Sequence, residues 1–263
     1  MPFTPAHAAA ALPFRRLPLI PSALVVGTMA PDFEYFLRLS AGGGFGHTAL
    51  GAVVLTWPLA LAVLWIFHFC VKDAVVSLSP EGFQRRLTPY LGTFRFGGAA
   101  RFSWIAVSVL LGIATHIVWD GFTHPTTWLA HHWRFLGEYV PLPIAARVPY
   151  YKLFQHGSSV IGLAILAAWL TRWYRATAPS GEPILHPLST RQKIAIVSIG
   201  CSVAAFDAMM RIAAEIEFRT RYLSLSKVVG HAVVTVIAVC WWELVAYGLF
   251  RLSKVRRSQQ FDL

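Results

Sequence analysis

The chain alternates between long apolar runs and short polar connections. A helix needs about 20 apolar residues to cross a bilayer. Runs of about this length cover Thr48–Val71, Phe102–Phe122, Ser158–Trp173, Ile194–Ala213 and Val228–Leu252. The third run is the shortest of them. The pattern predicts an all-α integral membrane protein, a helical bundle of about five transmembrane helices.

One more apolar segment, Leu17–Ala30, precedes these runs. It is too short to span a membrane comfortably, and Pro18 and Pro21 interrupt it. We predict that it forms a re-entrant or interfacial segment. A signal peptide is the alternative interpretation, because Arg15 and Arg16 precede the apolar residues, but the prolines are unfavourable for a signal sequence.

Neither an internal repeat nor a long linker divides the chain. We therefore expect a single membrane domain over residues 1–263. The motifs of the candidate site fall within residues 1–160, and two C-terminal helices fall within residues 190–252.

The composition supports a membrane protein. Hydrophobic residues make up 56% of the chain and charged residues only 13%, whereas about 25% are charged in soluble domains. The net charge of +11 would be compatible with nucleic-acid binding, but the sequence shows no clustered basic and aromatic face. Lys and Arg instead fill the connections between apolar runs, where they orient helices and contact anionic lipids. We predict membrane and lipid contacts and no nucleic-acid partner.

The basic residues also predict an orientation. If the helices alternate, the larger share of Lys and Arg falls on the side that contains the C-terminus, with many of them close to the ends of the runs. The positive-inside rule places that side in the cytoplasm. The N-terminus would then lie outside.

The second apolar run ends in the stretch THIVWDGFTH, which carries three ionisable residues at intervals of four. His116 and Asp120 would share one face of a helix and could bind the same metal ion. Since His124 precedes Pro125, we expect the helix to end between Asp120 and His124. Structural hydrogen bonding is the alternative, but ionisable groups within a membrane usually have a function.

The predicted topology brings further ligand-type residues to the same side of the membrane. His7, Asp32 and His47 precede the first span, and His156 begins the third. Together with the three residues above, the candidates are His7, Asp32, His47, His116, Asp120, His124 and His156. His68 and His186 fall on the other side. Because all seven candidates fall on one side of the membrane, we predict a single site at the extracytoplasmic face.

The donor types indicate a metal centre. Imidazole and carboxylate groups without cysteine favour zinc, with iron or manganese as alternatives, and favour a catalytic over a structural site. The candidates outnumber the four ligands of one tetrahedral zinc ion, so we expect one or two ions. If there are two, Asp32 or Asp120 would bridge them. Candidates that do not bind the metal themselves would then hold the ligands in orientation.

Several stretches resemble a known family: the opening MPFTPAHAAAALPFRRLPLIPSALVVGTMAPDFEYFLR, then FGHT, ATHIVWDGFTH and FQHGSS. The chain is similar to bacterial membrane proteins of the domain of unknown function 4184 family. The order of motifs is also similar to that of predicted membrane-bound metal-dependent hydrolases of the bacterial SOS response and, more remotely, to the zinc phospholipase C group. The resemblance implies a helical metal site in the bacterial cytoplasmic (inner) membrane, with His7, Asp32, His47, His116, Asp120 and His124 as ligands.

These observations predict a metal-dependent hydrolase acting on a phosphoester or related bond of a lipid or lipid-linked substrate. Asp120 and His156 would be catalytic, with His156 as general acid or as an orienting group. Two alternatives remain. A lipid-diphosphate lyase or cyclase would use magnesium and mostly carboxylates, and a metal-binding or transport protein would favour a midplane site and repeated halves.

Overall fold

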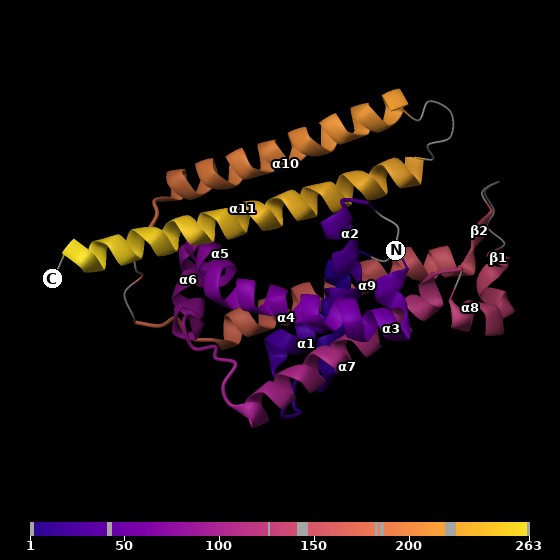
Figure 1. Cartoon of the computed structure of the whole chain (residues 1–263), viewed down its shortest axis with the longest axis horizontal. Helices are drawn as coiled ribbons and strands as arrows, with labels where there is room; N and C mark the ends of the chain where they lie inside the picture. Colours follow the sequence, from indigo (N-terminus) through magenta and orange to yellow (C-terminus); the bar gives the residue numbers. More distant parts are fainter. Residues whose placement is uncertain are drawn as a thin grey trace. The chain divides into compact units, whose positions relative to one another are not determined.

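The computed structural model describes residues 3–40, 44–125, 127–140, 147–181, 184, 187–218 and 225–261. These residues are mostly helical, as predicted (Figure 1). They form two compact units, which are described separately. The first comprises Met1–Phe33, Gly44–Leu64 and Phe96–Arg175, and the second comprises Glu34–Gly43, Trp65–Arg95 and Ala176–Leu263. The predicted single domain stays a prediction.

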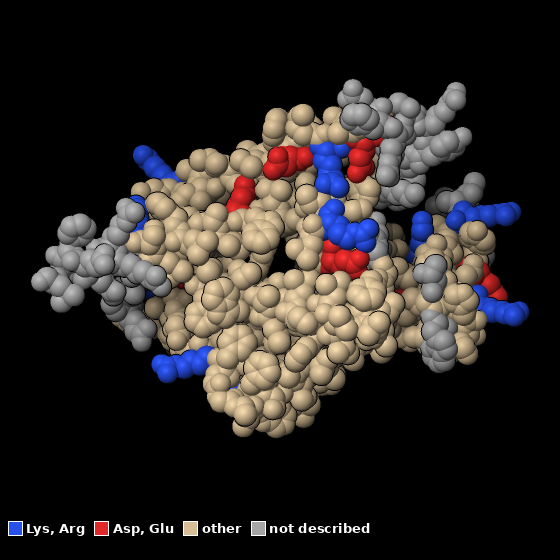
Figure 2. All heavy atoms as spheres, viewed as in Figure 1, with Lys and Arg blue, Asp and Glu red and all other residues tan. Residues whose placement is uncertain are grey.

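Within the described residues, five helices are long and apolar enough to cross a membrane. They are Ala49–Leu78, Ala99–Thr123, Tyr150–Ala176, Thr190–Ile216 and Val228–Lys254. Each contains most or all of one predicted apolar run, so the all-α membrane fold is confirmed. The surface seen in Figure 2 is accordingly mostly uncharged, with few Lys, Arg, Asp and Glu side chains.

The first unit is built from helices and one small strand pair. Its helices are η1 (Thr4–Phe14), α1 (Pro21–Met29), η2 (Ala30–Asp32), η3 (Phe45–His47), α3 (Ala49–Gly51), η4 (Ala52–Thr56), α7 (Ala99–Thr123), α8 (Trp128–His132), η7 (Arg134–Gly137) and α9 (Tyr150–Ala176). Two helices, α2 (Phe33–Arg38) and α4 (Trp57–Ile66), begin in this unit and end in the second. Strands β1 (Tyr139–Val140) and β2 (Val148–Pro149) pair antiparallel.

The predicted N-terminal segment forms α1, which is only nine residues long. Pro21 does not interrupt this helix but begins it, at a position where the missing N–H is not needed. The N–H of Ile20, just before the helix, donates to Ser108 Oγ of α7 at 2.9 Å. At this length α1 cannot cross a bilayer as a regular helix.

Helix α1 packs directly on α7, and two glycines make the close approach possible. A Cβ atom on Gly27 would lie 2.3 Å from the Val109 carbonyl oxygen, and one on Gly112 would lie 2.5 Å from that of Leu24. Membrane helices commonly use small residues in this way to bring backbones together. The contact fixes α1, and the residues that follow it, against the helix that carries His116 and Asp120.

The second unit contains η5 (Phe67–Val71), α5 (Lys72–Leu78), α6 (Glu81–Leu87), η6 (Thr88–Tyr90), α10 (Thr190–Phe218) and α11 (Leu225–Phe261). Helices α10 and α11 pack side by side (Figure 1). His231 of α11 and Glu215 of α10 lie 2.8 Å apart, and Arg251 donates to Asp73 at 2.7 Å. These two pairs join α11 to α10 and to α5.

Candidate metal centre

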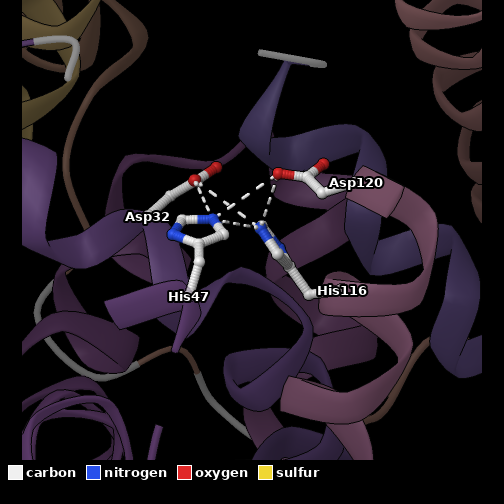
Figure 3. Close-up of side chains that lie close together, drawn as sticks. All are labelled: Asp32, His47, His116 and Asp120. Carbon is white, nitrogen blue, oxygen red and sulfur yellow. Dashed lines mark hydrogen bonds and ion pairs between the residues drawn. The ribbon is translucent and has the colours of Figure 1, made fainter. Parts of the chain in front are cut away.

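Four of the predicted ligands come together in the first unit (Figure 3). Asp32 ends η2, His47 ends η3, and His116 and Asp120 lie one turn apart on α7. One donor atom from each lies within 4.8 Å of the others. Segments far apart in sequence thus meet at the end of one membrane-spanning helix.

Five of the six distances between donor atoms in this four-residue cluster fit a tetrahedral ion, and the sixth, between the two carboxylates, is within 4.8 Å. His47 Nε2 and His116 Nε2 are 3.3 Å apart. Each of these nitrogens lies between 3.4 and 3.6 Å from Asp32 Oδ1 and from Asp120 Oδ2. The edge of a tetrahedron is about 1.6 times the metal–ligand distance, so zinc bound at about 2.0–2.2 Å requires donors about 3.3–3.6 Å apart. This buried Asp/His cluster could hold a metal ion.

Hydrogen bonds from outside the cluster aim two of its donors inward. The Nδ1 atom of His116 lies 2.8 Å from the Thr28 carbonyl oxygen and donates to it, which leaves the lone pair of Nε2 directed at the cluster. Thr4 Oγ1 donates to Asp32 Oδ2 at 2.6 Å. Asp32 Oδ1, which faces the two histidines, is buried and has no hydrogen-bond partner among the described residues. A bound cation would satisfy this oxygen.

His7 lies against the cluster from the N-terminal helix η1. It is fully buried, and its Nε2 is 3.4 Å from Asp120 Oδ1, the carboxylate oxygen that does not face His47 and His116. Burial, together with the neighbouring His116, lowers the pKa of His7 to about 3. His7 is therefore neutral at physiological pH and keeps a lone pair available.

The electrostatics of the cluster also favour a cation. Burial raises the pKa of Asp32, and the negative charge of Asp120 acts in the same direction. Two carboxylates in a buried site are costly unless a positive charge compensates them. A divalent ion bound between them would supply that charge.

Side-chain exposure shows where the cluster reaches the surface. The side chains of His7, Asp32, His116 and Asp120 are at most 5% exposed. In contrast, those of His47 and His124 are 20% and 24% exposed. The accessible side of the cluster is therefore the one with His47 and His124.

His124 and His156 occupy different places. Helix α7 ends at Thr123 and His124 adopts an extended conformation, which confirms the predicted helix end before Pro125. His124 Nδ1 still lies 3.5 Å from Asp120 Oδ2. His156 is exposed on α9, and no hydrogen bond or ion pair joins it to the cluster within the described residues. Its general-acid role stays a prediction.

The residues that support the cluster carry no signal in the sequence. Thr4 lies one turn before His7, Thr123 Oγ1 is 3.5 Å from Asp120 Oδ1, and the Trp119 ring packs 5.1 Å from the His7 ring. Threonine and tryptophan are common in membrane helices and carry no motif of their own. Only their proximity to His7 and Asp120 in sequence could have indicated them.

The fold and the site define a multi-pass membrane protein with a buried Asp/His cluster able to hold a metal ion. Residues 1–249 match the family described as Domain of unknown function (DUF4184), so the chain belongs to this family. Neither a curated protein nor a solved structure matches the chain. The chemistry must therefore be inferred from the site itself.

Proposed function

We propose that this protein is a membrane-embedded, metal-dependent hydrolase that acts on a phosphoester or related bond of a lipid or lipid-linked substrate. The observation that carries the proposal is the set of four converging donors, five of whose six separations match the edges of a zinc tetrahedron. A site without thiolates and with a partly exposed ligand, His47, is typical of catalytic rather than structural zinc.

Each residue of the cluster has a definite part in this proposal. Asp32, His47, His116 and Asp120 would hold the ion, and Asp120, with one oxygen toward His7, could share a second one. When bound, the metal lowers the pKa of a coordinated water toward about 7 and neutralises charge on the substrate oxygens. Thr4 and the Thr28 carbonyl keep Asp32 and His116 in position.

The position of the cluster supports an amphiphilic substrate. His116 and Asp120 belong to the last two turns of a span that ends at Thr123. The end of a span lies at the level of lipid headgroups. A phosphate ester at this level, with its hydrocarbon part in the bilayer, would meet the accessible side of the cluster.

The geometry also bears on the two alternatives. The cluster lies at the end of a span, whereas a transport site is expected near the middle of the membrane. Two imidazole nitrogens among four donors suit zinc better than magnesium, which prefers oxygen ligands. Hydrolysis is therefore the favoured function.

Metal analysis and phosphate release together test the proposal. Protein purified without chelators should contain zinc or a similar transition metal and should release phosphate from phosphatidic acid or a prenyl phosphate in a lipid panel. Asp120→Asn should lose metal and activity, because it removes a negatively charged ligand. His132→Ala, at an exposed histidine of α8, is the matched control and should keep both. Metal-replete protein that hydrolyses nothing in the panel would contradict the proposed reaction.

The sidedness of the site forms a separate part of the proposal: it faces the extracytoplasmic side. Gly44, just before η3, has open space around its Cα and would accept a cysteine. In a variant without Cys70, Cys201 and Cys240, Gly44→Cys should react with an impermeant thiol reagent added to intact cells. Reaction only after lysis would reverse the orientation.

A further inference from the structure

An apolar groove of about 610 Å³ runs along one face of α7 beside the cluster. Helix α7 lines it with residues three and four positions apart from Leu111 to Thr123, and Phe154 and Ser158 of α9 close its other wall. At about 1.5 Å per residue, the α7 wall is about 18 Å long. Both helices are membrane-spanning, so the groove lies within or next to the hydrocarbon region.

The polar groups of the groove wall are engaged in hydrogen bonds with other groups of the protein. Trp119 Nε1 donates to Ser158 Oγ at 3.0 Å, and Thr115 Oγ1 donates to the Gly112 carbonyl oxygen at 2.7 Å. The exposed lining therefore consists of methyl, methylene and aromatic groups, among them those of Val118. Such a surface offers no hydrogen-bond partner to a polar ligand, but it can bind a hydrocarbon chain.

One end of the groove adjoins the cluster. Thr123 lines the groove, and its hydroxyl lies 3.5 Å from Asp120 Oδ1. Trp119 lines it too, and its ring packs 5.1 Å from the His7 ring. A molecule lying in the groove would thus have one end at Thr123, next to Asp120.

The surroundings of the groove select its occupant. Both walls belong to membrane-spanning helices and the exposed lining is apolar, so the acyl chains of the bilayer are the molecules that reach it. We infer that the groove binds one hydrocarbon chain of the substrate lipid and so holds its headgroup at the cluster. This inference rests on the proposed function, because it names the part of the substrate that is recognised.

Photo-crosslinking tests the inference without relying on turnover. The metal-loaded protein would be placed in nanodiscs of phosphatidylethanolamine and phosphatidylglycerol that contain a small fraction of phosphatidic acid with a diazirine in one acyl chain. Mass spectrometry would locate the labelled residues. We expect labelling at Ala114, Val118 and Phe154 to exceed that at Val107, which is 47% exposed on the same helix but does not line the groove.

Two matched variants sharpen the test. Val118→Trp would fill the groove, and Val107→Trp adds the same side chain three turns away on the same face of α7. Val118→Trp should reduce groove labelling about tenfold, which corresponds to about 1.4 kcal/mol, and Val107→Trp should not. An unchanged metal content would show that each variant is folded. If Val118→Trp misfolds, Ala114→Leu serves as the second groove variant. Equal labelling at groove residues and Val107, or no change in both groove variants, would overturn the inference.

Hydrolysis assays on the same samples separate the two proposals. Val118→Trp should slow release of phosphate from long-chain phosphatidic acid but not from soluble glycerol phosphate. If no variant hydrolyses any substrate while the groove is labelled selectively, the hydrolase proposal fails and the chain-binding groove stands. If the wild type hydrolyses lipid phosphate while labelling is uniform, the groove inference fails alone. Crosslinks from the groove to another protein chain would also overturn it.

Discussion

The imidazole ring of His7 stacks on that of His116, with ring centroids 4.0 Å apart and an angle of 23° between the planes. His7 belongs to η1 and His116 to α7, so this contact joins the N-terminal helix to the helix that carries half of the four-residue cluster. His7 is thereby held with its Nε2 beside the second oxygen of Asp120.

His7→Phe distinguishes a metal ligand from a packing residue. Phenylalanine retains an aromatic ring for stacking but offers no lone pair to a metal. Because neither ring nitrogen of His7 has a hydrogen-bond partner among the described residues, we expect it to ligate a second ion. His7→Phe should therefore lose part of the bound metal, measured by elemental analysis, and keep the equivalent held by the other four residues. Full metal content in this variant would assign His7 to packing alone.

Thr4→Val tests the hydrogen bond that orients Asp32. The substitution keeps the shape of the side chain but removes the hydroxyl that donates to Asp32 Oδ2. Loss of such a supporting contact typically lowers metal affinity by about 10–100-fold. Competition with a fluorescent chelator would measure the change. Thr4→Ser restores the donor and should bind metal like the wild type; equal affinity in Thr4→Val would show that the hydroxyl has no part in orienting Asp32.

Gly112→Ala tests the close packing of α1 on α7. The added Cβ would lie 2.5 Å from the Leu24 carbonyl oxygen and 2.6 Å from the Thr28 nitrogen, so the helices must separate. Overpacking of this kind costs about 1–3 kcal/mol, and it would also displace the Thr28 carbonyl that orients His116. We expect a lower melting temperature in detergent and weaker metal binding.

Gly157→Ala in α9 is the control, because a Cβ there meets no other atom within 4 Å. Replacing glycine by alanine inside a helix usually stabilises it by about 0.5–1 kcal/mol. The two substitutions should therefore shift the melting temperature in opposite directions. A Gly112→Ala protein as stable as the wild type would contradict the packing described for α1.

The sequence predicted the spans and most of the cluster for one physical reason. Apolar runs of membrane length leave few arrangements, and an alternating topology places Asp32, His47 and the end of α7 on one side. Helix geometry alone places His116 and Asp120 on one face of α7, because they are four residues apart. The restriction that Pro125 puts on the residue before it accounts for the helix end.

Other features depend on tertiary contacts that no local pattern encodes. The helix begun by Pro21 packs on α7 through Gly27 and Gly112, which could not be paired without the structure. The hydroxyl of Thr4 is equally unremarkable in sequence. Topology could bring His156 to the same side of the membrane, but it could not determine whether the residue reaches the cluster.

The last prediction concerns the histidine that would donate a proton to the leaving group in the proposed hydrolysis. His124 lies at the accessible side of the cluster, 3.5 Å from Asp120, whereas His156 is exposed on α9 without a contact to the four ligands among the described residues. A proton donor must come within hydrogen-bond reach of the reacting group, and its loss costs about 10²–10⁴ in rate. Of the two, the geometry favours His124. We therefore expect His124→Gln to slow phosphate release by about this factor with the metal of the four-residue cluster retained, and His156→Gln to change turnover much less. Metal content and kcat measured on both variants would decide between them: a large loss of turnover in His156→Gln alone, with metal unchanged, would return the general-acid role to His156.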